Sequence, residues 1–226
     1  MIFLPPIGKP NFPNPENADE NGLVAVGGKL TPDWLVDAYS KGLFPWFNEG
    51  YAIMWWSPDP RAVLYPSKVK IHKSMRSVFN QKKFELRINF AFEKVIENCS
   101  RMPRKGQDGT WINSLVLKNY IKLHKLGYAH SFEAWKNEEL VGGLYGIALG
   151  KIFFGESMFS FQANASKFAF ISMCRILEDK GFYLIDCQQD TQHMQSLGSE
   201  LISRVEFLDI LKKNSACDSI KSDRVF

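Results

Sequence analysis

Apolar and polar positions follow helix and strand periods through the second half of the 226-residue chain. Apolar residues at helical spacing mark helices, whereas short apolar runs between turn residues mark strands. In chain order the predicted elements are a helix over 114–126, strands over 128–135, 140–149 and 152–158, a helix from about 164 to 180, a strand over 183–187 and a helix over 203–213. This order is that of an α+β acyltransferase-type domain, in which a mostly antiparallel sheet splays beside the helix that follows its central hairpin.

The first sixty residues carry weaker patterns. Residues 1–20 are rich in Pro and Asn, which predicts an extended arm. A helix begins at Thr31, with Pro and Asp in its first turn, and ends at Gly42. Aromatic residues then crowd between prolines, so we expect loops to hold these rings, mostly as a small aromatic core. The Pro58 to Pro60 stretch is the predicted boundary between domains over 1–60 and 61–226.

Two of the predicted strands end in polar groups that a core would not select. Glu156 and Ser157 follow one apolar run, and Asp186 and Gln188 follow the other. Buried carboxylates are costly without a partner, because desolvation disfavours their charged form. If the strands are neighbours, these side chains line one cleft, which is the candidate site. The strands also contain glycines that need a bulge or a close neighbour, such as a ligand. These glycines are Gly142, Gly143, Gly146 and Gly155.

The composition restricts the classes of protein to which the chain can belong. With 45% hydrophobic and 23% charged residues the chain is globular, and a net charge of +4 does not by itself indicate a nucleic-acid partner. The four cysteines show no CxxC spacing, so we expect reduced thiols. The N-terminus lacks the regions of a signal peptide, and no apolar run reaches the roughly 18 residues of a membrane span. We therefore expect a soluble, cytoplasmic protein.

Positive charge is concentrated between residues 61 and 87, where Glu85 is the only acid. A field of one sign attracts polyanions, and binding to a phosphate backbone requires such a surface. The alternative is the solvated face of a helix around 74–80, which explains most charge runs. The scarcity of acids favours nucleic acid, and Arg101, Arg104 and Lys105 would extend the surface. The cations of the run are Arg61, Lys68, Lys70, Lys73, Arg76, Lys82, Lys83 and Arg87.

Several chemistries lack the residues they need. The histidines are scattered without metal-ligand spacing, and neither a Walker-type loop nor a dinucleotide-binding GxGxxG follows a strand. Ser157 begins like a nucleophile elbow, but Phe159 stands where the second glycine must be, which disfavours a hydrolase that pairs Ser157 with His193. An acyl-CoA transferase would need a glycine-rich loop at the start of the second long helix, and residues 162–166 contain no glycine.

Seven short motifs occur in order along the chain. They are GLFPWF at 42–47, WWSPDPR at 55–61, GTWI at 109–112, LVGGLYG at 140–146, FGESMFS at 154–160, NASK at 164–167 and LIDCQ at 184–188. Together they strongly resemble the motifs of the bacterial leucyl/phenylalanyl-tRNA–protein transferases. The resemblance spans about residues 20 to 210, and seven motifs in order are far more specific than any one of them.

The resemblance implies a two-domain monomer whose larger domain has an acetyltransferase-like (GNAT-like) fold. It implies an aminoacyltransferase that moves Leu or Phe, and less readily Met, from aminoacyl-tRNA to the N-terminal Arg or Lys of an acceptor protein. The modified protein would then be degraded under the N-end rule. The resemblance also implies that the enzyme needs no metal or organic cofactor.

The resemblance assigns the donor site by position. Trp46 and Trp111 match the aromatic groups around the terminal adenosine of the tRNA, where bases stack on ring faces. The residues that match the apolar pocket for the aminoacyl side chain are Leu144, Phe153, Gly155 and Ile185. The residues that fit binding of the tRNA backbone are Lys73, Arg76, Lys82 and Lys83.

The polar residues of the two strands match the acceptor side of the reaction. Glu156 matches a position that can pair with the cationic side chain of the acceptor, and Asp186 and Gln188 match the pair beside the reacting amine and ester. Ser157 is expected to line the substrate site without acting as a nucleophile. Asp186 is either a general base or an electrostatic anchor, and the sequence leaves both open.

Two alternative functions also stay open at this point. A tRNA-binding module without transfer activity would explain the basic run and the tryptophans, but it leaves Glu156, Asp186 and Gln188 unexplained. A CoA-dependent acetyltransferase is the third possibility. Labelled Phe-tRNA and a peptide that begins with Arg distinguish all three, because only the transferase places the label on the peptide.

Overall fold

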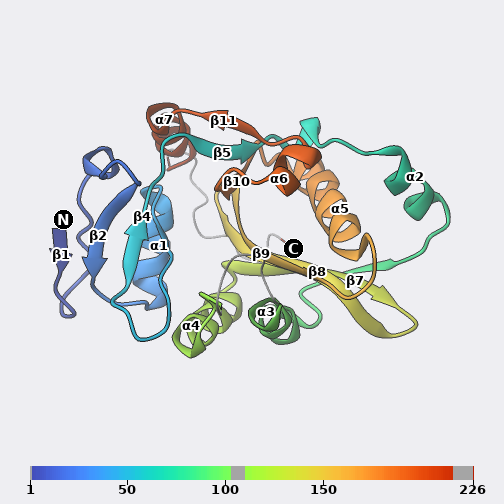
Figure 1. Cartoon of the computed structure of the whole chain (residues 1–226), viewed down its shortest axis with the longest axis horizontal. Coiled ribbons are helices and arrows are strands. Elements are labelled where there is room, and N and C mark those ends of the chain that lie inside the picture. The colour runs from blue at the N-terminus through green and yellow to red at the C-terminus, as the bar shows by residue number, and fades with distance from the viewer. Residues whose placement is uncertain (1, 103–109, 216–225) are drawn as a thin grey trace.

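Figure 1 shows the computed structural model of the chain, which describes residues 2–102, 110–215 and 226. The described residues form an α+β structure with a four-stranded sheet near the N-terminus and a seven-stranded sheet after it. A small N-terminal domain and a larger domain with a mixed sheet were predicted, and both are confirmed. The chain passes from the small sheet to the large one between Trp56 and Arg61. The exact domain boundary at residue 60 stays a prediction.

The small sheet has the strand order β1, β2, β4, β3, with β1 parallel to β2 and the other pairs antiparallel. Phe12 packs edge-on against both Trp34 and Trp55, which gives this domain the expected aromatic core. The predicted arm is more ordered than expected, because it supplies β1 and a short 3₁₀ helix. The elements are β1 Ile2–Leu4, η1 Pro15–Asn17, β2 Leu23–Gly27, α1 Pro32–Ser40, β3 Phe44–Pro45 and β4 Met54–Trp56.

The large sheet has the order β11, β5, β10, β9, β8, β7, β6, and all its pairs are antiparallel except the central pair of β9 and β10. The apolar pattern predicts four of these strands. It misses β5, β6 and β11, which have only three or four residues each. The strands are β5 Arg61–Leu64, β6 Glu85–Ile88, β7 Ala129–Lys136, β8 Glu139–Leu149, β9 Ile152–Ser160, β10 Leu184–Gln188 and β11 Glu200–Ile202.

Helices cover both faces of the large sheet. In Figure 1, α5 lies on one face and α3 and α4 lie on the other, with α2 beside α5. The predicted helices near 74–80, 114–126, 164–180 and 203–213 are confirmed, whereas α3 and α6 were not predicted. The remaining elements are η2 Pro66–Lys68, α2 Lys73–Asn80, α3 Phe92–Arg101, α4 Ser114–Lys125, α5 Ala165–Asp179, α6 Gln192–Leu197 and α7 Arg204–Ser215.

Strand alternation divides the core into two parts. Successive side chains of a strand point to opposite faces, so Phe153 lies in the core under α5 while Phe154 lies in a core that the sheet shares with the N-terminal domain. The ring of Phe154 packs edge-on against Tyr39 of α1. The next residue on the Phe154 face is Glu156. The Glu156 side chain is thus directed toward the contact between the large sheet and the N-terminal domain.

Close packing explains three of the four strand glycines. A Cβ added to Gly142, Gly143 or Gly146 would lie 2.6, 2.9 or 2.3 Å from a neighbouring protein atom, so these positions need no ligand. Gly155 differs, because the nearest atom to its added Cβ is the Asp186 carbonyl oxygen at 3.6 Å. Of these four glycines, only Gly155 can therefore still be explained by a ligand that lies against the strand.

Among the residues that the structure describes, no helix has the length and apolar character needed to cross a lipid bilayer.

Candidate active site

A cavity of about 300 Å³ opens where the central strands β9 and β10 part. The two strands pair in parallel only as far as Phe154 and Asp186, and beyond these residues their chains diverge around the cavity. Both predicted strand ends therefore meet at one site, as the sequence pattern suggests. The residues that line it are Phe44, Pro45, Trp46, Trp111, Leu144, Tyr145, Gly155, Glu156, Ser157, Met158, Phe170, Met173, Ile185, Asp186, Cys187, Gln188, Gln189, Thr191, His193 and Met194.

Glu156 is held by three hydrogen bonds from different parts of the fold. Tyr39 of α1 donates to its Oε1 at 2.7 Å, and Tyr120 of α4 donates to its Oε2 at 3.1 Å. The Gln188 carboxamide of β10 donates to Oε1 at 3.0 Å. The carboxylate thus has a fixed orientation at the cavity wall. Nothing in the local sequence marks Tyr39 and Tyr120, because both lie at buried helix positions and resemble ordinary core residues.

Burial raises the pKa of Glu156 to about 7, and the nearby Asp186 carboxylate adds to this rise, while the three hydrogen bonds oppose it. The two tyrosine hydroxyls also lie 2.5 Å from each other. Burial raises the pKa of both tyrosines, so each carries one proton. When Glu156 is ionised, the two hydroxyl groups supply only two protons for the three short oxygen contacts among Glu156, Tyr39 and Tyr120. A proton on Glu156 would supply the third. The geometry therefore agrees with the raised pKa.

Asp186 is fully buried and forms an ion pair with Arg61 of β5. Arg61 donates from Nε to Oδ1 at 2.8 Å and from Nη2 to Oδ2 at 2.7 Å. Oδ1 also accepts the backbone N–H of Gln188 at 2.9 Å. Both carboxylate oxygens are thus occupied. Arg61 is 1% exposed and does not belong to the surface for polyanions in which the sequence pattern placed it, because its charge is paired with Asp186 in the core.

Gln188 owes its position to an irregularity in β10. The pairing of β10 with β5 shifts between Asp186 and Gln188, and Gln188 has a φ of 64°. A left-handed conformation is uncommon for a residue other than glycine and is found at functional sites that hold it by surrounding contacts. Here the contacts are its N–H bond to Asp186 and its side-chain bond to Glu156.

The apolar wall of the cavity comes from β8, β9, β10, α5 and α6. Leu144, Gly155 and Ile185, which the resemblance assigns to the aminoacyl pocket, are among the residues that line it. Phe153 is not among the lining residues, because its ring is fully buried next to Phe132, and its assignment to the aminoacyl pocket stays a prediction. The sequence pattern did not indicate the side chains of Met158, Phe170, Met173 and Met194, which complete the wall. Flexible methionines adapt to ligands of different shape.

Aromatic rings border the cavity on the side of the N-terminal domain. Trp46 and Trp111 both line it. Trp46 is half-buried, packs edge-on against Trp56 and accepts the Trp56 indole N–H on its carbonyl oxygen at 2.7 Å. Trp111 packs edge-on against Tyr120. Both rings are fixed by neighbours and border space that a ligand can enter.

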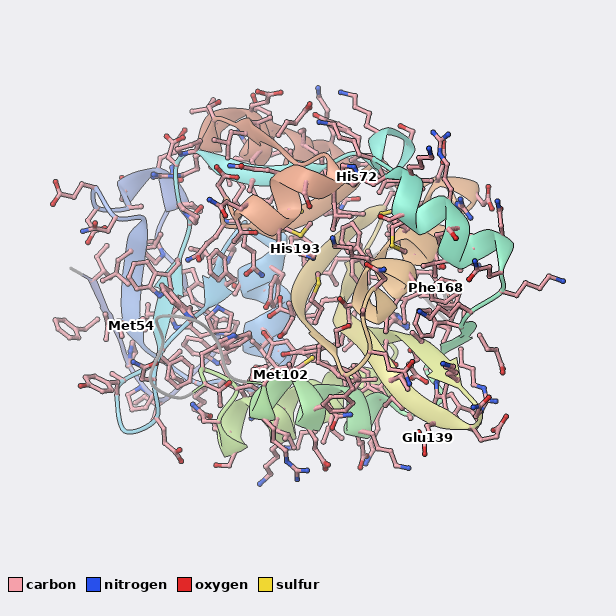
Figure 2. All side chains as sticks on the ribbon, turned by 45° about the vertical axis from the view of Figure 1, so that its right-hand side comes forward. Met54, His72, Met102, Glu139, Phe168 and His193 are labelled. Carbon is pink, nitrogen blue, oxygen red and sulfur yellow. The ribbon has the colours of Figure 1, made fainter. Side chains whose placement is uncertain are left out.

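Ser157 and His193 also line the cavity. His193 belongs to α6 and lies near the middle of the molecule in Figure 2, whereas Glu139 lies at the outer end of a hairpin. Burial lowers the pKa of His193, and the charge of Lys167 lowers it further, so the site favours the neutral imidazole. Among the described residues, no group of three or more His, Cys, Asp or Glu side chains could hold a metal ion.

The predicted tRNA-binding cations lie on α2 and on the turn after it. Lys73, Arg76, Lys82 and Lys83 are all exposed, so their charges face solvent. Arg87 differs, because it is paired with Glu85 and Glu138 at 2.7 Å each. The positive surface of this region is therefore smaller than the sequence suggests. Two further predicted members, Arg104 and Lys105, lie outside the described residues.

We expect Gly155→Val to narrow the cavity without loss of the fold. The added Cβ would lie at an ordinary van der Waals distance, 3.6 Å, from its nearest neighbour, the Asp186 carbonyl oxygen, and φ at this position is not in the left-handed region. A misplaced methyl group in an apolar pocket costs about 1 to 3 kcal/mol of binding, so transfer of a bulky aminoacyl group should fall roughly tenfold or more. Gly155→Ala should give a rate between those of the wild type and Gly155→Val. Unchanged kinetics with an unchanged melting temperature would show that no substrate occupies this space.

Comparisons with known proteins give one consistent result. Residues 63–212 match the family model described as leucyl/phenylalanyl-tRNA protein transferase, and residues 28–59 match the model of that family's N-terminal domain. A leucyl/phenylalanyl-tRNA–protein transferase from Christiangramia forsetii is 55% identical over 213 residues, which cover 93% of this chain and 100% of the relative. One from Flavobacterium johnsoniae is 51% identical over 211 residues, with 93% and 96% covered.

The likeness to solved structures is distant. A functionally unknown protein from Staphylococcus epidermidis is 10% identical, with a TM-score of 0.43, and the match covers 80% of this chain and 68% of that protein.

Proposed function

The chain belongs to the leucyl/phenylalanyl-tRNA–protein transferase family, and on that premise we propose how its cavity joins an aminoacyl-tRNA to an acceptor protein. The enzyme is an aminoacyltransferase that moves Leu or Phe from tRNA to protein. We further propose that the acceptor carries an N-terminal Arg or Lys, that Met is a poorer donor, and that the modified protein is degraded. The proposed enzyme is a monomer in the cytoplasm.

One observation carries the proposal: an apolar pocket, two tryptophans and a polar pair share a single cavity. The donor side chain would enter the apolar wall at Leu144, Gly155 and Ile185. An unbranched or γ-branched side chain gains burial there. The terminal adenosine would stack against Trp46 or Trp111 at the border.

The acceptor would place its cationic side chain near Glu156. This carboxylate faces the cavity and has a fixed orientation, so it can pair with a guanidinium or an ammonium group without reorganisation. Because the pKa of Glu156 is near 7, the pairing charge is present above that pH. The charge of an acceptor cation would in turn favour the ionised form.

The reaction itself is the attack of a neutral α-amine on the ester carbonyl of the donor. A C–N bond forms, the C–O bond to the 3′ end of the tRNA breaks, the amine nitrogen gives up one proton, and the departing oxygen takes up a proton. Free α-amines have a pKa of about 7.7 to 8, so a useful fraction is neutral near pH 7.5. Aligned reactants can gain on the order of 7 to 11 kcal/mol from positioning, which is the main task left to the protein.

Of the two roles considered for Asp186, we propose the electrostatic anchor. A general base must reach the proton that it removes, and Asp186 is fully buried with both oxygens bound by Arg61. Gln188 is better placed to meet the amine, since its side chain lies at the cavity next to Glu156. The proposed reacting surface is thus Gln188 and Glu156, with Asp186 behind them.

The experiment that tests this function is direct. The protein is incubated with labelled Phe-tRNA and a peptide that begins with Arg, and the label on the peptide is measured. We expect transfer to this peptide and to one that begins with Lys, and little to a peptide that begins with Gly. Binding of Phe-tRNA without transfer would instead indicate a tRNA-binding module.

We expect Trp46→Ala to weaken binding of the donor more than the rate of the bound complex. Stacking of a base on an aromatic side chain is worth about 1 to 3 kcal/mol, so KM for a phenylalanyl-adenosine donor should rise roughly tenfold or more. Steady-state kinetics with this short donor isolates the cavity from the rest of the tRNA. A wild-type KM in the variant would remove Trp46 from the adenosine site.

The exposed cations beside α2 should act only on full-length tRNA. We expect Lys82→Ala with Lys83→Ala to weaken binding of Phe-tRNA and to reduce the slope of log Kd against log salt by about 0.7 to 0.9 for each phosphate that is no longer neutralised. A matched control is Lys118→Ala with Lys122→Ala, two exposed lysines of α4 on the other face of the sheet (Figure 1). An equal salt slope in both double variants would contradict the assignment.

A further inference from the structure

Arg61 occupies an unusual position for a charged residue. It begins β5, the strand that follows the N-terminal domain, and it is 1% exposed. Its guanidinium lies between two aromatic rings, with the Phe44 centroid 4.9 Å and the Phe207 centroid 4.5 Å from Cζ. Phe44 belongs to β3 of the small domain and lines the cavity, whereas Phe207 belongs to α7. The group is therefore clamped directly behind the cavity wall.

A continuous set of hydrogen bonds leads from Arg61 to the cavity. The guanidinium binds both oxygens of Asp186 through Nε and Nη2. Asp186 Oδ1 accepts the backbone N–H of Gln188, and the Gln188 side chain donates to Glu156. The planar fork of an arginine fixes the plane of a carboxylate, which a lysine cannot do in the same way. The plane of Asp186 in turn fixes the acceptor for the Gln188 N–H.

Stability alone is a poor explanation for this arrangement. Apolar side chains of similar volume often replace a buried ion pair with no loss of stability, or with a gain. Arg61 Nη1 is moreover buried without a hydrogen-bond partner among the described residues, which adds to the cost of keeping the charge there. Gln188 is also held in a left-handed conformation that a residue with a side chain seldom adopts.

We infer that Arg61 is a positioning residue for aminoacyl transfer: its fork holds Asp186 so that Gln188 keeps the turn that places its carboxamide at Glu156. The inference rests on the proposed function, because the rate it affects is that of transfer. Arg61 itself touches no substrate. Its loss should lower the rate of the bound complex and leave donor affinity nearly unchanged, since Trp46 and Trp111 are held by contacts with Trp56 and Tyr120.

The test uses the full-length chain with Arg61→Lys, Arg61→Met and the double variant Arg61→Met with Asp186→Asn. Methionine keeps much of the apolar packing between the two rings, and the asparagine side chain keeps an oxygen that can accept the Gln188 N–H. Arg87→Met is the matched control, because Arg87 is also ion-paired but lies on the surface near the outer edge of the sheet. Kd for Phe-tRNA, the melting temperature and the single-turnover rate at saturating Phe-tRNA and Arg-peptide are measured.

We expect the single-turnover rate to fall roughly 30- to 100-fold in Arg61→Met, which is the scale of a misplacement of about 1 Å at a reacting group. Arg61→Lys should be intermediate, because it keeps the charge but not the fork, and Arg87→Met should match the wild type. Kd for Phe-tRNA should stay within about twofold in all of them. A uniform loss of rate and affinity would indicate a merely structural role and overturn the inference.

The double variant covers the case in which Arg61→Met does not fold, since it leaves no unpaired buried charge. If Arg61→Met with Asp186→Asn folds and transfers at the wild-type rate, the fork is dispensable and the inference is wrong. If the double variant folds and transfers slowly with unchanged Kd, the inference holds. If the double variant is also unfolded, Arg61→Lys is the deciding variant, and a wild-type rate of transfer by Arg61→Lys overturns the inference. Absence of transfer by the wild-type chain would instead refute the proposed function.

Discussion

Glu156→Gln is expected to lower kcat/KM for an Arg-peptide about a hundredfold. Removal of one partner from a desolvated, hydrogen-bonded charge pair costs about 2 to 5 kcal/mol, and each 1.4 kcal/mol is a factor of ten. Glutamine keeps the size of the side chain. Its carbonyl oxygen can still accept the Tyr39 hydroxyl, and its amide N–H can donate to the Tyr120 oxygen, so the cavity should keep its shape. Glu139→Gln, on the exposed hairpin end, is the control and should behave as the wild type.

The same substitution should alter the dependence on pH. The pKa of Glu156 is raised from 4.5 to about 7, so its carboxylate is lost as the pH falls through 7. In the wild type kcat/KM should therefore rise with two ionisations, that of Glu156 and that of the acceptor amine, whereas Glu156→Gln should show only the second. A raised pKa in an acid also means that the folded state favours the protonated form. The contribution of Glu156 to stability is therefore present below pH 4.5 and is lost as the pH rises from 4.5 to about 7.

The pH dependence of stability gives a second measurement for Glu156→Gln. Above pH 7 the variant should be as stable as the wild type or more stable, because it removes a buried ionised group while its carboxamide can still bond to both tyrosines. Denaturant unfolding at about pH 5 and about pH 8, on either side of the raised pKa, measures the difference. A variant that is inactive and also strongly destabilised at the higher pH would contradict a role for Glu156 in binding the acceptor.

Asp186→Ala is expected to have the largest effect on stability. The substitution leaves the Arg61 guanidinium buried without a counter-charge, and removal of one partner of a buried ion pair costs about 3 to 5 kcal/mol. The Gln188 N–H also loses its acceptor. Urea titration should show the loss as a lower midpoint, with a smaller loss in Asp186→Asn, which keeps one oxygen acceptor.

The control for this prediction is Asp190→Asn. Asp190 is exposed and accepts a hydrogen bond from Gln195 at 2.8 Å, so its change should stay within about 0.5 kcal/mol. In those molecules of Asp186→Ala that remain folded, single-turnover transfer should also be depressed while affinity for tRNA is kept. Equal stability of the two variants would show that the Arg61 pair contributes nothing to the fold.

Sequence periodicity was sufficient where elements are long. Strands β7, β8 and β9 and helix α5 carry apolar patterns over eight or more residues, and their ends agree with the prediction to within a few residues. Strand β5 could not be found in this way, because its four residues are buried by partners from distant parts of the chain. The residues next to β5 in the sequence do not indicate that it pairs with β10 and β11.

Residues of the site could likewise be predicted only where their own neighbours in the sequence mark them. The polar ends of β9 and β10 stand out in the sequence because each follows its own apolar run, and so Glu156, Asp186 and Gln188 could be selected. Arg61 could not be told from the basic residues after it, since its partner Asp186 lies 125 residues further on. Phe153 was assigned to the pocket by resemblance, whereas in the structure its ring is fully buried and is not among the residues that line the cavity.

The central claim is that one cavity selects both the donor side chain and the charge of the acceptor. The most direct measurement is single-turnover transfer from labelled Phe-tRNA to two peptides that differ only at the N-terminal residue, Arg in one and citrulline, its neutral isostere, in the other. We predict a preference for Arg of about a hundredfold in the wild type, which disappears in Glu156→Gln. Equal transfer to both peptides by the wild type, or an unchanged preference in the variant, would contradict the claim.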